Sequence, residues 1–157
     1  RKIPAYMFIT AGCQPANLQG KWNGSTNPAW KCRYTVNINT EMNYWPANIC
    51  GLAQSEEPLF DLLARMVPNG QRTARELYHC RGFVAHHNTD LWGDTDPQDR
   101  YIPASFWPMG AAWLCTHIWR HYLYSVIRSF CVHSSRRSSR RCSSSPTFWS
   151  RTPMVIM

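Results

Sequence analysis

The sequence contains no acidic residue beyond Asp99, although the chain runs to 157 residues. This absence matters because the formal net charge of +8 would otherwise favour a nucleic-acid-binding protein. Residues 1–125 carry 11 Lys and Arg against 9 Asp and Glu, so this part is nearly neutral. The remaining positive charge lies on Arg128, Arg136, Arg137, Arg140, Arg141 and Arg151. The charge distribution therefore argues against a basic body and leaves basicity to the tail.

The seven cysteines contain no C-x-x-C pair, and their spacing is irregular. Zinc ribbons need paired cysteines, and a closed disulfide framework needs an even number, so the pattern argues against both. We expect most of the cysteines to be small buried residues, which assigns no redox compartment.

Long apolar runs are also missing, since none approaches the ~20 residues of a membrane span. Residues 1–10 lack the charged, apolar and small-residue regions of a signal peptide, and the chain begins with Arg1. A chain of 157 residues has room for one domain with a sizeable core. We therefore expect a soluble piece of a longer protein.

Helical spacing is the commonest pattern in the rest of the sequence. Residues 39–50 are expected to form a helix, because Met42, Trp45 and Ile49 recur at helical spacing before Gly51. No series of alternating strands is evident, so the sequence predicts an all-α fold.

A clearer helix is predicted from Ser55 to Val67. Ser55 is a candidate N-cap, and two acids and Pro58 lie in the first turn. One face carries Leu59, Leu62, Leu63 and Met66. Asn69 and Gly70 are expected to form a turn that is followed by a short helix.

The apolar segment 105–124 predicts a helix, and its small residues Gly110, Ala111 and Ala112 would allow close packing. Between the helices, residues 81–103 are expected to form a long loop that carries function.

The densest polar cluster is AHHNTDLWGDTDPQDR, residues 85–100. A zinc site would recruit His86, His87 and Asp90, but adjacent histidines diverge and no HExxH pattern supports one. Two interpretations remain open at this point. The histidines and aspartates either satisfy backbone groups and cap turns, or they form a sugar-binding cleft beside the flat face of Trp92.

The segment VNINTEMNYWPAN, residues 36–48, holds four asparagines among apolar residues. Asparagine forms helices and strands poorly because its amide competes with the backbone for hydrogen bonds. Asn37 and Asn39 therefore indicate either turn and capping chemistry or a polar site on a rigid frame.

Five segments in order resemble glycoside hydrolase family 95, the inverting α-L-fucosidases, some of which act on α-L-galactosides. These segments are QPANLQGKWN, YTVNINTEMNYWPANICGL, EPLFDLLARM, GQRTARELY and RGFVAHHNTDLWGDTDPQDRYIPASFWPMGAAWLCTHIW. The resemblance covers about Gln14 to Tyr124. It implies an all-α (α/α)6 barrel, of which residues 1–125 would supply the first few helices.

The resemblance also implies a substrate and a set of site residues. It suggests terminal α-L-fucosides on fucosylated glycans, with α-1,2 linkage as one candidate, and no cofactor, metal, nucleic-acid or membrane partner. In this family an N-x-N pair orients the attacking water, and Asn37 and Asn39 match it. His87, Asn88, Asp90 and Trp92 would then line the sugar site. The family also suggests secretion or an extracytoplasmic location.

The family's general acid, a glutamate in an S-P-E motif, is absent, as is a late aspartate that helps the asparagines. Glu41, Glu56, Glu57 and Glu76 match neither position. We expect Glu41 to be structural or to line the site, and Glu56, Glu57 and Glu76 to be ordinary helix residues. The isolated chain should be inactive and loosely packed, with exposed apolar surface on Trp107, Trp113, Leu114, Ile118 and Trp119.

Residues 126–157 form a basic Ser/Arg-rich tail that is expected to be disordered. Restoring one nucleotide after the codon of Phe130 converts the tail into an amphipathic helix followed by Pro-Asp-Gly, which indicates a frameshift. Two other functions stay open: a non-catalytic carbohydrate-binding remnant, and a nucleic-acid binder acting through the tail. The last would lose affinity steeply with salt.

Overall fold

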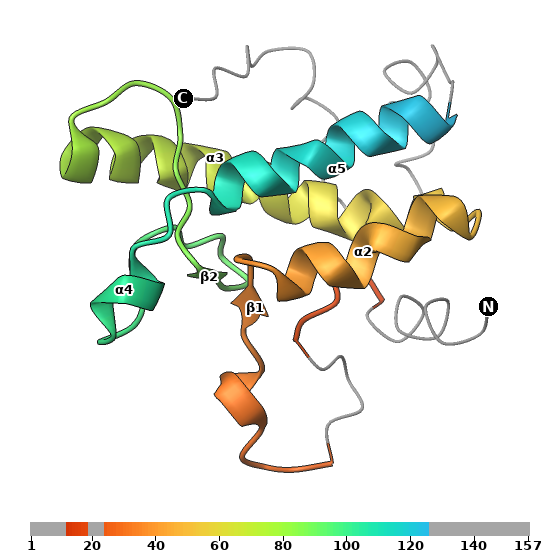
Figure 1. Ribbon diagram of the computed structural model, residues 1–157, viewed down its shortest axis with the longest axis horizontal. Coiled ribbons are helices and arrows are strands. Elements are labelled where there is room, and N and C mark those ends of the chain that lie inside the picture. The colour runs from red at the N-terminus through yellow and green to blue at the C-terminus, as the bar shows by residue number, and fades with distance from the viewer. Residues whose placement is uncertain (1–11, 19–23, 126–157) are drawn as a thin grey trace.

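The computed structural model of the chain describes residues 12–18 and 24–125, and the predicted tail lies outside them. Three helices dominate this part: α2 (Asn39–Ile49), α3 (Glu57–Tyr78) and α5 (Gly110–Ser125) (Figure 1). The short elements are η1 (Ala29–Cys32), β1 (Tyr34–Thr35), η2 (Ala53–Glu56), β2 (Asn88–Thr89) and α4 (Ile102–Ser105). The predicted all-α class is confirmed.

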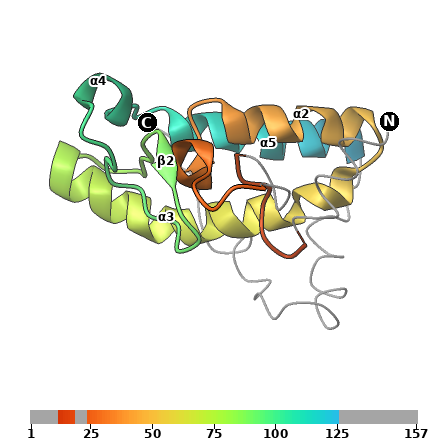
Figure 2. The same ribbon diagram turned by 90° about the horizontal axis from the view of Figure 1, so that it is seen from below.

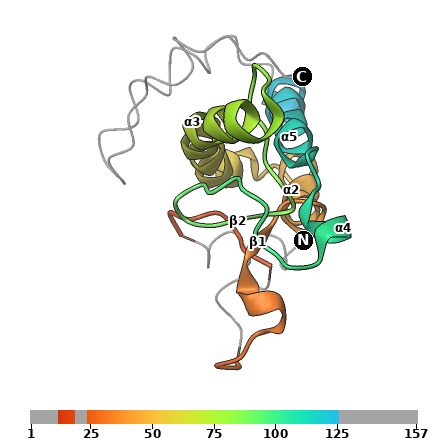
Figure 3. The same cartoon turned by 90° about the vertical axis from the view of Figure 1, so that its left-hand side faces the viewer.

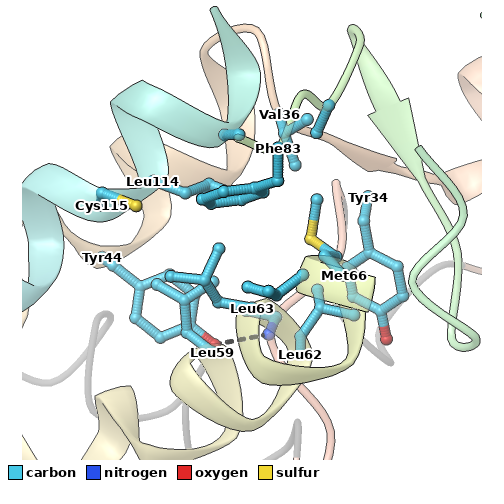
Figure 4. Close-up of a cluster of buried hydrophobic side chains, with 14 of the residues drawn as sticks. Tyr34, Val36, Tyr44, Leu59, Leu62, Leu63, Met66, Phe83, Leu114 and Cys115 are labelled. Atoms are coloured by element: carbon cyan, nitrogen blue, oxygen red, sulfur yellow. Dashed lines mark hydrogen bonds between the residues drawn. The ribbon is translucent and has the colours of Figure 1, made fainter. Parts of the chain in front are cut away.

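Helices α2 and α5 pack against each other, and α3 lies along one side of this pair (Figure 2). The core lies between the three helices (Figure 4). Its central side chains are Tyr44, Leu59, Leu62, Leu63, Met66, Phe83 and Leu114. The predicted apolar face of α3 is therefore correct, since its four members are at most 2% exposed.

The helix predicted at residues 39–50 forms as α2, but the apolar residues whose spacing indicated it do not face the core. Met42, Trp45 and Ile49 are 48%, 39% and 73% exposed, whereas Tyr44 and Ala47 are buried. Ala47 is small enough for close approach, and the Tyr44 hydroxyl accepts a hydrogen bond from Ala16 N–H at 2.8 Å. Periodicity located the helix but not its inner side, because both faces carry apolar residues.

The start of α3 also differs from the prediction. Ser55 does not cap the helix, because it lies in η2 and its hydroxyl donates to the Leu52 carbonyl at 2.6 Å. No side chain caps the first turn of α3.

The predicted turn at Asn69 and Gly70 does not form, and α3 continues through Pro68 to Tyr78. Gly70 is buried against the following loop: a Cβ there would lie 2.6 Å from the Val84 carbonyl oxygen. The glycine therefore serves close packing inside a helix rather than a turn.

The predicted helix at 105–124 begins later, at Gly110, because Pro108 separates α5 from the short α4. Trp107 and Trp119 are 37% and 61% exposed, as predicted, but Leu114 is buried in the core. Trp113 and Ile118 are half-buried.

The described cysteines form no disulfide, and the prediction that most would be buried is wrong. Among the five, Cys115 alone is buried, and burial raises the pKa of its thiol to about 11. Cys13 and Cys50 are exposed. Within residues 12–18 and 24–125, no helix is long and apolar enough to cross a membrane.

Candidate active site

A short antiparallel ladder joins the asparagine segment to the polar loop. Thr35 of β1 pairs with Asn88 of β2, and the Val36 N–H donates to the His87 carbonyl at 2.7 Å. The ladder lies beside the start of α2 (Figure 3). Two segments about 50 residues apart in sequence are thus held side by side.

Asn37 and Asn39 lie where β1 passes into α2. Asn37 occupies a turn, and Asn39 is the first residue of α2. The backbone between them is not an extended strand, because Ile38 has φ −176° and ψ −40°. Both residues are half-buried, and neither side-chain amide hydrogen-bonds to another described residue. Two uncommitted amides are therefore held on an ordered turn.

His86 has a structural role. Its Nδ1 lies 2.6 Å from the Thr95 carbonyl oxygen, which can only accept, so Nδ1 carries the proton. Nε2 then accepts from the Tyr78 hydroxyl at 2.7 Å, and the two rings stack. With both nitrogens committed, this fully buried ring ties the loop to the end of α3.

His87 and Asn88 are also buried, but their hydrogen bonding is incomplete. Asn88 Nδ2 donates to His87 Nε2 at 2.8 Å, and Asp99 Oδ2 lies 3.7 Å from the same nitrogen. His87 Nδ1 and Asn88 Oδ1 have no partner among the described residues. Buried polar atoms are normally paired, so a pair left open marks a place for a ligand or water.

Asp90 closes the loop, because its Oδ1 accepts hydrogen bonds from the N–H groups of Trp92 and Asp94 at 2.9 and 3.0 Å. This contact is the turn-capping role that competed with sugar binding. The Trp92 side chain is 78% exposed and stands free of the core.

The same loop is held closely against α3. Asn69 Nδ2 donates to the carbonyls of Trp92 and Gly93 at 3.1 and 2.9 Å. Gly93 has φ +75°, and a Cβ there would lie 2.9 Å from Met66 N, so only glycine fits. The loop that presents Trp92 is therefore rigidly anchored.

Glu41 was not singled out by its sequence position, yet it has an unusual environment. The residue is 0% exposed, and both carboxyl oxygens lack a side-chain or backbone partner among the described residues. Burial raises the pKa of Glu41 from 4.5 to about 8, with a small opposing effect of its own backbone N–H. Thr35 and Thr40, on the same segment, also have buried hydroxyls without partners. No sequence signal separates this glutamate from an exposed one.

Within the described part of the chain, no three His, Cys, Asp or Glu side chains form a group that could hold a metal ion.

The comparisons with known proteins show the family of the chain. The glycosyl hydrolase family 95 catalytic domain matches residues 5–134. The chain belongs to this family. The family's catalytic domain is an (α/α)6 barrel, to which the helices described here contribute.

Three similar proteins carry fucosidase names. "Alpha-L-fucosidase 2" of Arabidopsis thaliana is 41% identical over 128 residues, which cover 80% of this chain and 15% of the relative. "Probable alpha-fucosidase A" of Aspergillus niger is 38% identical over 125 residues, or 76% of this chain and 16% of the relative. A protein of the same name from Aspergillus oryzae is 36% identical over 94 residues, which cover 57% of this chain and 13% of the relative. The matched part of the chain thus spans only 13–16% of the length of these relatives.

Proposed function

We propose that this chain supplies the water-orienting part of an inverting α-L-fucosidase site that acts on terminal α-L-fucosides of fucosylated glycans. The observation that carries the proposal is the pair of half-buried amides of Asn37 and Asn39 beside the His87–Asn88 pair. Membership of family 95 and the fucosidase names of the similar proteins support fucose as the sugar.

The chemistry of inversion explains why amides are suited to this place. An inverting glycosidase holds a water between the sugar and a general base, on the face opposite the leaving group. An amide cannot remove a proton, but its oxygen accepts and its NH2 donates, so two amides can fix a water's orientation. Asn37 and Asn39 would orient this water, and a carboxylate outside this sequence would take the proton.

His87 and Asn88 offer a matching pair for a sugar hydroxyl. With Nε2 accepting from Asn88, a neutral His87 carries its proton on Nδ1, which is buried and unpaired. The Asn88 Oδ1 is a buried, unpaired acceptor. A hydroxyl accepts one hydrogen bond and donates another, so it could satisfy both atoms. Trp92 would contribute an exposed aromatic face at the rim.

We expect the isolated chain to hydrolyse an aryl α-L-fucoside no faster than background. The sequence contains no S-P-E motif and no acidic residue after Asp99 that could serve as the late aspartate. General acid help alone contributes roughly 100- to 10,000-fold. Release of the chromophore by purified chain would measure this, and turnover that Asn39→Ala abolishes would contradict the expected inactivity of the isolated chain.

In a complete catalytic domain, Asn88→Ala should raise KM for the fucoside at least about tenfold, because a desolvated hydroxyl partner is lost. Trp92→Ala should raise KM less, and Leu91→Ala is the matched control, since this neighbouring side chain is 44% exposed. Asp90→Ala should lower the melting temperature through its capping role. Unchanged KM and kcat in the Asn88 and Trp92 variants would show that the loop is structural only.

A second candidate is sugar binding without hydrolysis, which the exposed Trp92 and the absent acid both favour. Adding L-fucose to the chain and following indole fluorescence or amide NMR shifts separates the two functions. If L-fucose binds to the chain and the complete domain shows no turnover, the function is sugar binding alone. Turnover by the complete domain would identify the function as hydrolysis.

A further inference from the structure

A buried charged cluster lies away from the sugar site and was missed in the sequence. The Glu56 cluster consists of Asn48, Glu56, His117 and His121. Glu56 is 0% exposed, and its Oε2 lies 2.8 Å from His121 Nδ1. Its Oε1 lies 3.8 Å from His117 Nδ1, and Asn48 Nδ2 donates to the two oxygens at 3.1 and 3.0 Å. The expectation that Glu56 is an ordinary helix residue is therefore wrong.

The surroundings of the Glu56 cluster are mostly apolar. His117 and His121 are 1% and 6% exposed, and each ring meets an aromatic ring edge-on, Tyr44 for His117 and Phe60 for His121. Among the described residues, the titratable groups that face Glu56 are Tyr44 from α2 and the two histidines from α5, while Phe60 of α3 is apolar. A carboxylate has no proton to donate, so the His121 nitrogen that faces it must supply one.

The charge state of Glu56 follows from these contacts. Burial by itself raises the pKa of a carboxyl, but the close imidazole of His117 and the hydrogen bonds from His121 and Asn48 together outweigh it, so the pKa of Glu56 lies below its ordinary value. Removing one partner from a buried charged pair is strongly destabilising, because the other partner then stays buried and uncompensated.

The Glu56 cluster joins the two helices that begin at the candidate site. Asn48 belongs to α2, which starts with Asn39. The histidines belong to α5, which starts at Gly110, where a Cβ would lie only 2.8 Å from the His86 carbonyl oxygen. Glu56 itself ends η2 and leads into α3. A shift of α2 against α5 would therefore move the asparagines relative to the polar loop.

We propose that Glu56 is a positioning residue that locks α2 to α5 through the two histidines, and that protonation of its carboxylate releases the lock. The lock is a property of the fold. Its link to catalysis rests on the function proposed above.

The stabilisation of the fold by ionised Glu56 should depend on pH. A carboxyl whose pKa is lower in the folded state stabilises the fold fully above the ordinary value of about 4.5, and the stabilisation is lost as pH falls through the folded pKa. We therefore expect unfolding in urea to require progressively less denaturant below pH 5 in the native chain.

Glu56→Gln should lower the folded-to-unfolded ratio on the order of 100-fold at pH 7, because a buried partner is removed. The loss of stability between pH 5 and 3 should also become shallower. Glu57→Gln is the matched control. The carboxylate of Glu57 is next in sequence but exposed, so its loss should change the stability little. Equal stability of Glu56→Gln and the native chain at pH 7, or equal pH slopes, would overturn the lock.

A second measurement covers a Glu56→Gln variant that fails to fold. In the native chain, ring 15N shifts of His121 should show a step below pH 5 that reports protonation of Glu56. Protection of the α2 and α5 amides against hydrogen exchange, relative to the intrinsic rate at each pH, should fall over the same pH range. The absence of such a step in the His121 ring shifts, together with unchanged amide protection in α2 and α5, would contradict the proposal.

Both experiments use the chain without substrate, so they fail or succeed independently of the proposed fucosidase. The link to catalysis is tested separately in a complete catalytic domain, by measuring the acid limb of the pH profile of kcat. Glu56→Gln should shift that limb while KM stays nearly constant. If the lock is weakened but the pH at which kcat falls stays the same, Glu56 contributes to stability and not to catalysis.

Discussion

Asn39→Ala in a complete family 95 catalytic domain is expected to lower kcat roughly 100-fold or more, with a much smaller change in KM. The physical reason is that an oriented water contributes to the transition state but little to the bound ground state. The structure supports this role because the amide of Asn39 lies at the start of α2, half-buried and uncommitted to any described residue. Steady-state kinetics on an aryl α-L-fucoside would measure both constants.

Asn37→Ala should behave in the same way, and the double variant should lose little more than either single one, since two residues acting on one water are not additive. Asn27→Ala is the matched control, because Asn27 is exposed in the loop before η1. Circular dichroism at the assay temperature would exclude unfolding. A kcat within about twofold of the parent for both single variants would refute water orientation by this pair.

The comparison of sequence with structure shows which features periodicity can predict. The heptad-like run Leu59, Leu62, Leu63 and Met66 located one face of α3 correctly, because the opposite face is polar. In α2 both faces carry apolar side chains, so spacing could not select Tyr44 over Trp45. The choice depends on Ala16 and on α5, both distant in sequence.

Glycine was misjudged for a similar reason. Asn69-Gly70 is a common turn signal, but its neighbours alone do not decide between a turn and a close contact. The close approach of the Val84 carbonyl to Gly70 decides it, and that contact is tertiary. Motif resemblance identified the family correctly because it carries information about tertiary arrangement that local propensity lacks.

Buried charges were the least predictable feature. Glu41, Glu56 and Glu57 all lie in helical segments and look alike in sequence. The structure separates them into a buried acid without a partner, a buried acid with three partners and an exposed acid. The difference arises from α5, whose histidines reach Glu56 but not Glu41.

Glu41→Gln is expected to stabilise the chain at neutral and alkaline pH. Because burial raises the pKa of Glu41 to about 8, the unfolded state loses its proton near pH 4.5 while the folded state retains it. Stability therefore falls as pH rises from about 4.5 to 8, by roughly 3–5 kcal/mol in total. Glutamine cannot ionise, so the variant should escape this loss and be more stable by that amount above pH 8.

Urea unfolding at pH 5, 7 and 9 would measure the difference, with Glu76→Gln as the control because Glu76 is exposed on α3. The native chain and Glu41→Gln should differ little at pH 5, and the gap should widen at each higher pH. A protonated Glu41 at pH 7 would also be a hydrogen-bond donor next to the asparagine turn, which an ionised one cannot be. If the native chain and Glu41→Gln keep the same pH dependence, the carboxyl is ionised and has a cationic or hydrogen-bonding partner from beyond the described residues.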